Sequence, residues 1–169
     1  VSFVTGPARV PPPTGVDVHS VQTAQEMLTA VEGLLPADAA VFTAAVADWR
    51  MADVHGQKIK KQSSGALPVL QFAENPDILA RVSAHELRPQ LVVGFAAETE
   101  HVIDNATAKR LRKGCDWIVA NDVTPETGIM GGAHNKITLI DKVGAETWDE
   151  MPKIDVARRL AQRIADALT

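Results

Sequence analysis

An acid followed closely by lysines is the feature of this sequence best suited to chemistry. The apolar run Val41–Ala47 ends at Asp48, and Lys58, Lys60 and Lys61 come shortly afterwards. Lysine neutralises phosphate, and a carboxylate binds a hard metal ion or a sugar hydroxyl, so this pattern favours a polyphosphate with Mg²⁺. Taken alone, these residues fit a structural alternative better, in which the acid caps a turn and the lysines lie in a solvated loop.

Two further apolar runs end in polar residues in the same way. Leu91–Ala97 precedes Glu98, and Trp117–Ala120 precedes Asn121 and Asp122. Strands buried on both faces are continuously apolar, and open α/β sheets bind ligands at the carboxyl ends of their strands. We therefore expect these strand ends, together with the end of the first run, to line one site.

A helix predicted after the second of these strands adds cations. It covers residues 100–113 and carries Lys109 and Lys113, which lie on one face because residues four apart in a helix are neighbours. The alternative is that basic residues near the carboxyl end of a helix only complement its dipole, which is sufficient to explain Arg110 and Arg112.

The elements that position these residues alternate along the chain. The expected strands cover residues 1–5, 16–19, 40–47, 67–72, 91–97, 117–120 and 136–140, and the expected helices cover residues 23–35, 100–113 and 154–168. A further short helix begins at Asn75 as the cap and Pro76 as the first helical residue. This alternation predicts an α/β fold with a three-layer, doubly wound, mostly parallel sheet of the Rossmann-like kind.

The beginning of the chain lacks one element that such folds commonly have. No Gly-rich strand-to-helix turn of the phosphate-binding type is present, and the first residue is Val1. We therefore expect the first strand, turn and helix to be missing. The predicted organisation is a single domain over residues 1–169, truncated at its N-terminus.

Composition limits the class of protein. The chain has 169 residues, of which 46% are hydrophobic and 22% charged, with a formal net charge of −4. This is enough apolar material for one core, and the overall basic character of a nucleic-acid-binding protein is missing. A single cysteine, Cys115, excludes an intrachain disulfide, and no run has the length of a membrane span or the pattern of a signal peptide. The expected compartment is the cytoplasm.

Several short runs together resemble a known family. They are Ala44–Asp48, Lys58–Lys61, Asn75–Ile78, Gly94–Thr99, Lys109–Lys113 and Ala120–Val123. In this order and spacing they are similar to bacterial phosphopantothenate–cysteine ligase, the synthetase half of the bifunctional coenzyme A biosynthesis protein. The resemblance covers essentially the whole chain. The other half of that protein is a flavin-dependent decarboxylase, so FMN is implied only if such a domain is attached.

The resemblance implies a ligase reaction in two steps. CTP, as co-substrate with Mg²⁺, activates the carboxylate of 4′-phosphopantothenate as an acyl-cytidylate and releases pyrophosphate. The amine of L-cysteine then displaces CMP. Negative charge builds on the α-phosphate in the first step, so fixed cations and Mg²⁺ are what catalysis needs most.

The resemblance also implies which residues carry this chemistry. Lys58 is the expected catalytic lysine. The expected CTP-binding residues are Thr43, Ala44, Ala45, Asp48, Lys58, Pro76, Asp77, Ile78, Leu79, Phe95, Lys109 and Lys113. Mg²⁺ is expected to bind through the nucleotide phosphates, and its protein ligand stays open.

One part of the family pattern is not found in this sequence. The family's first segment carries a Gly-Thr turn, an Asn and a Ser-Ser-Gly-Lys-Met-Gly stretch that help to hold phosphopantothenate. We therefore expect nucleotide binding by this chain, but not normal turnover by the chain alone. The main alternative is a non-enzymatic nucleotide-binding or assembly fragment with a Rossmann-like fold. A nicotinamide-dependent oxidoreductase is a further alternative, which the absence of Gly-x-Gly-x-x-Gly disfavours.

Apolar residues near the lysine cluster predict an exposed antiparallel arm. Ile59, Leu67, Val69, Leu70 and Phe72 have no place in a core built on the three buried strands. An exposed arm leaves backbone groups unpaired, and pairing with a second copy satisfies them. We therefore expect a homodimer, and the resemblance implies the same, since the family's members are dimers joined through such strands.

Overall fold

The computed structural model describes residues 1–8, 10–53, 69–124 and 132–169. Its centre is a sheet of five strands in the order β10-β9-β7-β6-β3. The strands are β3 (Ala39–Phe42), β6 (Leu91–Glu98), β7 (Trp117–Asp122), β9 (Ile137–Ile140) and β10 (Ala145–Thr147). β3, β6 and β7 run parallel, while β9 and β10 are antiparallel to their neighbours. This confirms the predicted, mainly parallel α/β sheet.

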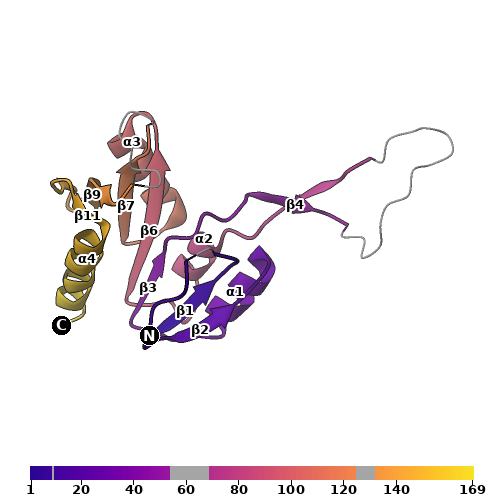
Figure 1. Ribbon diagram of the computed structural model, residues 1–169. Coiled ribbons are helices and arrows are strands. Elements are labelled where there is room, and N and C mark those ends of the chain that lie inside the picture. The colour runs from indigo at the N-terminus through magenta and orange to yellow at the C-terminus, as the bar shows by residue number, and fades with distance from the viewer. Residues whose placement is uncertain (9, 54–68, 125–131) are drawn as a thin grey trace.

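Helices cover both faces of this sheet (Figure 1). Side chains alternate along β6, so Val93 packs with Val156 and Leu160 of α4 (Lys153–Leu168). On the other face, Val92 packs with Ala106 of α3 (Val102–Lys113). The apolar residues of α4 recur at helical spacing, which is the pattern that predicted this helix. The three-layer arrangement is therefore confirmed.

A second, smaller unit precedes the central sheet. β1 (Ser2–Thr5) and β2 (Asp17–Ser20) form a parallel pair, and α1 (Ala24–Glu32) packs against β1. α1 begins where the helix over residues 23–35 was expected, because Thr23 caps it: Thr23 Oγ1 accepts from the Glu26 N–H at 3.1 Å. The Glu26 carboxylate in turn accepts from the Thr23 N–H at 3.2 Å, which completes a capping box.

An antiparallel arm extends away from the rest of the molecule (Figure 1). Its described part is β4 (Trp49–Met51) paired with β5 (Phe72–Glu74). Trp49 and Phe72 are 59% and 66% exposed, and Val69 is 88% exposed. The predicted exposed arm is confirmed in its described part, in which residues 69–71 are not in a strand and β5 begins at Phe72. The predicted arm residues Ile59 and Leu67 lie outside the described residues.

The first apolar run is shorter as a strand than its sequence indicates. β3 ends at Phe42, and residues 43–48 form an exposed loop between β3 and β4. β3 is also not fully buried, since Val41 is 45% exposed. Among the described strands β3 lies at the edge of the sheet, which leaves one of its sides without a neighbour.

One predicted helix start is wrong. α2 covers Ile78–Ser83, and its cap is Asp77, whose Oδ1 accepts from the Ala80 N–H at 3.1 Å. Asn75 lies two residues earlier and donates to a different loop. The end of α3 is as predicted, because Gly114 adopts the left-handed conformation with φ of 69°. The short antiparallel pair β8 (His134–Asn135) and β11 (Met151–Pro152) was not predicted.

The amino ends of β6 and β7 are tied together by one arginine. Arg88 donates to the carbonyls of Ser83 and Pro89 at 3.0 and 2.9 Å, and to Asp116 Oδ2 at 2.8 Å. The same carboxylate oxygen accepts from the Val92 N–H at 2.7 Å. Arg88 therefore joins the end of α2 to the first residues of both strands.

Candidate functional site

A cavity of about 360 Å³ lies where the loop after β3, the start of α2, β6 and α3 meet. Nine of the residues predicted to bind a nucleotide line it. They are Ala44, Asp48, Pro76, Asp77, Ile78, Leu79, Phe95, Lys109 and Lys113. Residues from four separate parts of the sequence thus come together in one place, at the ends of parallel strands where α/β sheets bind ligands.

The basic side of the cavity is formed by α3. Lys109, Arg112 and Lys113 all line it, at helical spacing that puts them on one face. Arg112 was interpreted from sequence as a residue that complements the helix dipole, so its role in the cavity was missed. Its position three residues after Lys109 was the signal that could have identified it. Three cations on one wall suit a polyanion such as a triphosphate.

Asp77 links the helix start to this basic wall. Its Oδ1 caps α2, while its Oδ2 accepts a hydrogen bond from Lys113 Nζ. The side chain of Lys113 is 22% exposed and that of Asp77 is 43% exposed, so the pair lies at the boundary between protein and solvent. Asp77 therefore compensates the charge of Lys113 and holds it at the cavity, where a phosphate group would compete for it.

The apolar wall depends on a close approach between α2 and β6. Leu79 of α2 and Phe95 of β6 both line the cavity. Gly94, beside Phe95, lies under Leu79, and a Cβ placed on Gly94 would stand 2.6 Å from Leu79 Cδ2. A glycine at this position therefore allows the helix to pack directly onto the strand.

Asn75 also has a different role in the structure from the predicted one. It lines the cavity, and its backbone N–H and its side-chain Nδ2 donate to the carbonyls of Asp48 and Ala47 at 2.8 and 2.9 Å. It was predicted as a helix cap because Asn is a common capping residue. The structure uses its amide to hold the loop after β3 instead.

Some predicted residues are not brought into the cavity. Thr43 and Ala45 belong to the same loop but are not among its lining residues, and Lys58 lies outside the described residues. Glu98 and Asp122 lie opposite each other at the paired ends of β6 and β7, but neither of them lines this cavity. Thr124 donates its N–H and hydroxyl to Asp122, which lowers the pKa of that carboxyl.

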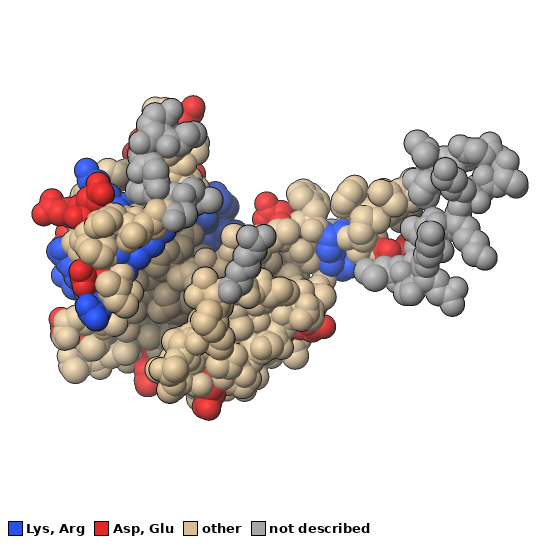
Figure 2. Space-filling model, in the orientation of Figure 1, with Lys and Arg blue, Asp and Glu red and all other residues tan. Residues whose placement is uncertain are grey.

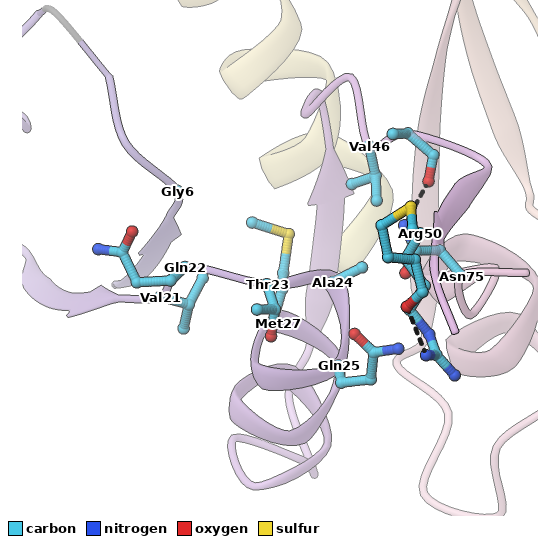
Figure 3. Close-up of a pocket in the computed structure, with 12 residues that line it drawn as sticks. Gly6, Val21, Gln22, Thr23, Ala24, Gln25, Met27, Val46, Arg50 and Asn75 are labelled. Carbon is cyan, nitrogen blue, oxygen red and sulfur yellow. Dashed lines mark hydrogen bonds between the residues drawn. The ribbon is translucent and has the colours of Figure 1, made fainter. Parts of the chain in front are cut away.

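A larger cavity of about 680 Å³ adjoins the first and shares Met27, Val46, Ala47 and Asn75 with it. Its other side chains come from the start of α1 and from the arm, including Gln25 (Figure 3). In the space-filling view a hollow separates the central sheet from the β1–β2 unit and is walled mostly by uncharged residues (Figure 2). The loop after β3 and Asn75 thus stand between two hollows.

The described part of the chain holds no group of three or more His, Cys, Asp or Glu side chains arranged to bind a metal ion. Mg²⁺ commonly takes only one or two carboxylates together with substrate phosphates, and Asp48 and Asp77 at this cavity fit that donor set. None of the described helices has the length and apolar character needed to cross a membrane.

An open sheet with helices on both faces, and a cation-lined cavity at the ends of its parallel strands, defines a doubly wound α/β domain of the Rossmann-like class. The sequence places it more narrowly. Residues 1–168 match the family described as DNA/pantothenate metabolism flavoprotein C-terminal domain, and the chain belongs to that family.

Curated relatives and solved structures agree with this assignment. The chain is 37% identical over 170 residues to the coenzyme A biosynthesis bifunctional protein CoaBC of Escherichia coli K12, covering 99% of this chain and 41% of that protein. It is 39% identical over 140 residues to CoaBC of Vibrio parahaemolyticus, covering 82% of this chain and 35% of that protein. The chain therefore spans less than half the length of these relatives.

The crystal structure of the C-terminal domain of a CoaBC protein superposes with a TM-score of 0.75 at 32% identity. The superposition covers 96% of this chain and 71% of that chain. A flavoprotein of the same family name from Streptococcus pneumoniae also has a TM-score of 0.75, over 98% of this chain and 80% of that chain. At 17% identity, this second likeness concerns the fold alone.

Proposed function

We propose that this chain is the synthetase domain of a CTP-dependent phosphopantothenate–cysteine ligase of coenzyme A biosynthesis. The observation that carries the proposal is the cavity in which Lys109, Arg112 and Lys113 face Asp48 and Asp77 at the ends of parallel strands. Family membership and the printed name of the relatives, a coenzyme A biosynthesis bifunctional protein, support the pathway. The cavity volume of about 360 Å³ lies in the range of small-molecule sites.

The first proposed step joins the carboxylate of 4′-phosphopantothenate to CTP. A carboxylate oxygen attacks the α-phosphorus, the bond to the β-phosphate oxygen breaks, and pyrophosphate leaves with the developing charge. The cations of α3 stabilise that charge, with Lys113 exchanging its contact with Asp77 for a phosphate oxygen. Mg²⁺ bound with the nucleotide would supply further charge neutralisation, and Asp48 and Asp77, which line the cavity, would hold it.

In the second step the amine nitrogen of L-cysteine attacks the activated acyl carbon. The bond to the phosphate oxygen breaks, CMP leaves and the amine loses a proton, which gives phosphopantothenoylcysteine. No protein nucleophile is required for this sequence. Cys115 fits a structural role, because it is buried and burial raises the pKa of its thiol.

Lys58 remains our proposed catalytic lysine, and Thr43 and Ala45 remain proposed contacts of the nucleotide through their backbone. These assignments rest on the family resemblance. Relatives that are bifunctional and longer than this chain support a fused decarboxylase domain, and FMN would belong to that domain. The cytoplasm is the proposed compartment.

A homodimer through the arm is also part of the proposal. Trp49, Leu70 and Phe72 expose between 53% and 66% of their surface on a two-stranded arm that stands away from the body (Figure 1). Light scattering should give twice the mass of the 18.1 kDa chain, and Val69→Asp should give the monomer. A wild-type monomer at micromolar concentration would reject this part.

Nucleotide binding is the direct test of the proposed site. Mg-CTP should stabilise the chain against heat much more than CMP, because the additional phosphates meet the cations of α3. Lys109→Gln and Lys113→Gln should each remove most of that difference. Lys142→Gln, in the exposed turn after β9, is the matched control and should leave it unchanged. Stabilisation by NAD with none by CTP would refute the proposal.

Turnover distinguishes an enzyme from a nucleotide-binding module. In the enzyme, pyrophosphate release from CTP requires 4′-phosphopantothenate, and the amide forms once L-cysteine is added. Tight binding of Mg-CTP without either reaction, in the chain together with the remainder of its protein, would favour the non-enzymatic alternative.

A further inference from the structure

Asn75 occupies a junction that connects the arm to the cavity. It is the first residue after β5, it lies two residues before the cap of α2, and it lines both cavities described above. Figure 3 shows Asn75 among the residues of the larger cavity. Residues 43–48, which it faces, are exposed and belong to no helix or strand. Something other than a regular ladder or a core must therefore fix this loop.

Asn75 donates hydrogen bonds to the carbonyls of three consecutive residues, Ala47, Asp48 and Trp49, at the end of the loop after β3 and the beginning of β4. Its backbone N–H donates to the Asp48 carbonyl at 2.8 Å, which extends the β4–β5 ladder by one residue. Its side-chain Nδ2 donates to the carbonyls of Ala47 at 2.9 Å and of Trp49 at 3.4 Å. The orientation of the amide is determined by these partners, because turning it over would place an oxygen against two carbonyl oxygens.

The remaining atom of the amide, Oδ1, is buried and has no hydrogen-bond partner in the described chain. A buried acceptor without a partner costs stability, so this arrangement is not what stability alone would favour. Against this cost, the side chain donates two hydrogen bonds to the carbonyls of Ala47 and Trp49. These bonds fix the position of the loop after β3, which we take to be the contribution of Asn75.

We propose that Asn75 is a positioning residue for the nucleotide cavity, which holds Ala47, Asp48 and Trp49 in register against the start of α2. The inference rests on the proposed function, because it assumes that the cavity binds the nucleotide. Asn75 acts through the loop: it sets where Asp48 stands relative to Asp77 and Lys113 on the opposite wall. The same hydrogen bonds fix the beginning of the arm at Trp49, so this clamp, formed by Asn75 on residues 47–49, holds both the arm and the cavity.

The test compares Asn75→Ala with the wild-type chain in two measurements. Hydrogen exchange without any ligand should be about tenfold faster in peptides covering residues 44–53 and 72–77, because two side-chain hydrogen bonds are lost. Titration calorimetry should then show binding of Mg-CTP weakened by about tenfold or more. Gln162→Ala is the matched control: it removes an exposed amide bond to Asp166 on α4, across the sheet, and should change neither measurement.

Asn75→Leu keeps approximately the size of the side chain and removes the donor without adding a charge, so it replaces the alanine variant if that variant does not fold. Faster exchange with weaker Mg-CTP binding supports the inference. A lower melting temperature with unchanged affinity, or unchanged exchange of both segments, overturns it, because Asn75 would then be only structural or not a clamp. A wild-type chain that binds no Mg-CTP refutes the proposed function instead, while hydrogen exchange still decides whether the clamp exists.

Discussion

Replacing Gly94 with alanine tests whether the cavity depends on the close approach between α2 and β6. Gly94 is buried within β6, and an added Cβ would stand 2.6 Å from Leu79 Cδ2 and 3.6 Å from Cys115 Sγ. Ordinary contacts of a Cβ lie beyond 3.4 Å, so the Leu79 side chain must move away. Leu79 lines the cavity, so a shift of its side chain would change the shape of the space that a ligand would occupy.

The size of the effect follows from the cost of overpacking. Inserting a methyl group into a packed site costs about 1–3 kcal/mol, and a chain of this size loses about 2–4 °C of melting temperature per kcal/mol. We therefore expect Gly94→Ala to melt about 2–12 °C lower than the wild type. Affinity for Mg-CTP should fall as well, by about tenfold if the displaced side chain removes a comparable amount of binding energy.

Calorimetric melting and titration with Mg-CTP measure the two effects. Gly144→Ala is the control, since a Cβ there meets no described atom within 4 Å, and it should change neither quantity. The double variant Gly94→Ala with Leu79→Ala should bind Mg-CTP more tightly than Gly94→Ala alone, because the space is restored. If Gly94→Ala melts and binds like the wild type, the close approach does not shape the cavity.

Three further predictions concern other parts of the fold. His101 precedes α3 in the left-handed conformation, with φ of 44° and no capping side-chain bond in the described chain, so His101→Asn should raise the free energy of unfolding by about 0.5–1.5 kcal/mol in urea denaturation. Arg88→Met should lower it by about 1–3 kcal/mol in the same assay, because the Asp116 carboxylate and two carbonyls lose a donor, whereas an equal stability would contradict a stabilising role of Arg88 at the strand ends. Hydrogen bonds from the backbone N–H and the hydroxyl of Thr124 lower the pKa of Asp122 below the ordinary 3.8, so their contribution to stability is complete above pH 3.8 and is lost as the pH falls through the folded-state pKa. Thr124→Ala removes only the hydroxyl bond, so the pKa measured by NMR should rise part of the way towards 3.8 and stay below it.

Local signals in the sequence were sufficient wherever an element is defined by its own residues. The start of α1 beside Thr23, the end of α3 at Lys113 and the apolar runs of β6 and β7 were all predicted from the residues of each element. At the two helix ends the deciding contacts join residues close together in the chain. The mainly parallel sheet then followed from the alternation of strands and helices.

Contacts between distant residues explain what could not be predicted. The apolar run after Val41 looks like a continuous strand, because small residues in a loop have the same hydrophobicity as small residues in a strand. Asn75 and Asp77 are both good capping residues, and the choice between them depends on the carbonyl of Ala47, 28 residues away from Asn75. The pairing of Lys113 with Asp77, 36 residues apart, is visible only in three dimensions.

The cavity residues were identified by the order of short motifs that resemble a family, whereas the physical reading of single motifs left structural alternatives open. Arg112 lines the cavity but was not among the predicted residues. It lies on the same helical face as Lys109 and Lys113, yet it belongs to no expected contact and its charge was assigned to the helix dipole.

The position of Trp49 gives the molecule an intrinsic optical probe. The chain has three tryptophans. Trp148 is 1% exposed with the Arg159 guanidinium 4.3 Å from its ring centre, Trp117 of β7 is partly buried, and Trp49 at the root of the arm is 59% exposed, the most exposed of the three. Indole emission shifts to longer wavelength in contact with water, and iodide quenches only indoles that it can reach. The long-wavelength, iodide-sensitive part of the fluorescence should therefore report the arm root, while emission from the buried indole provides an internal reference without any label.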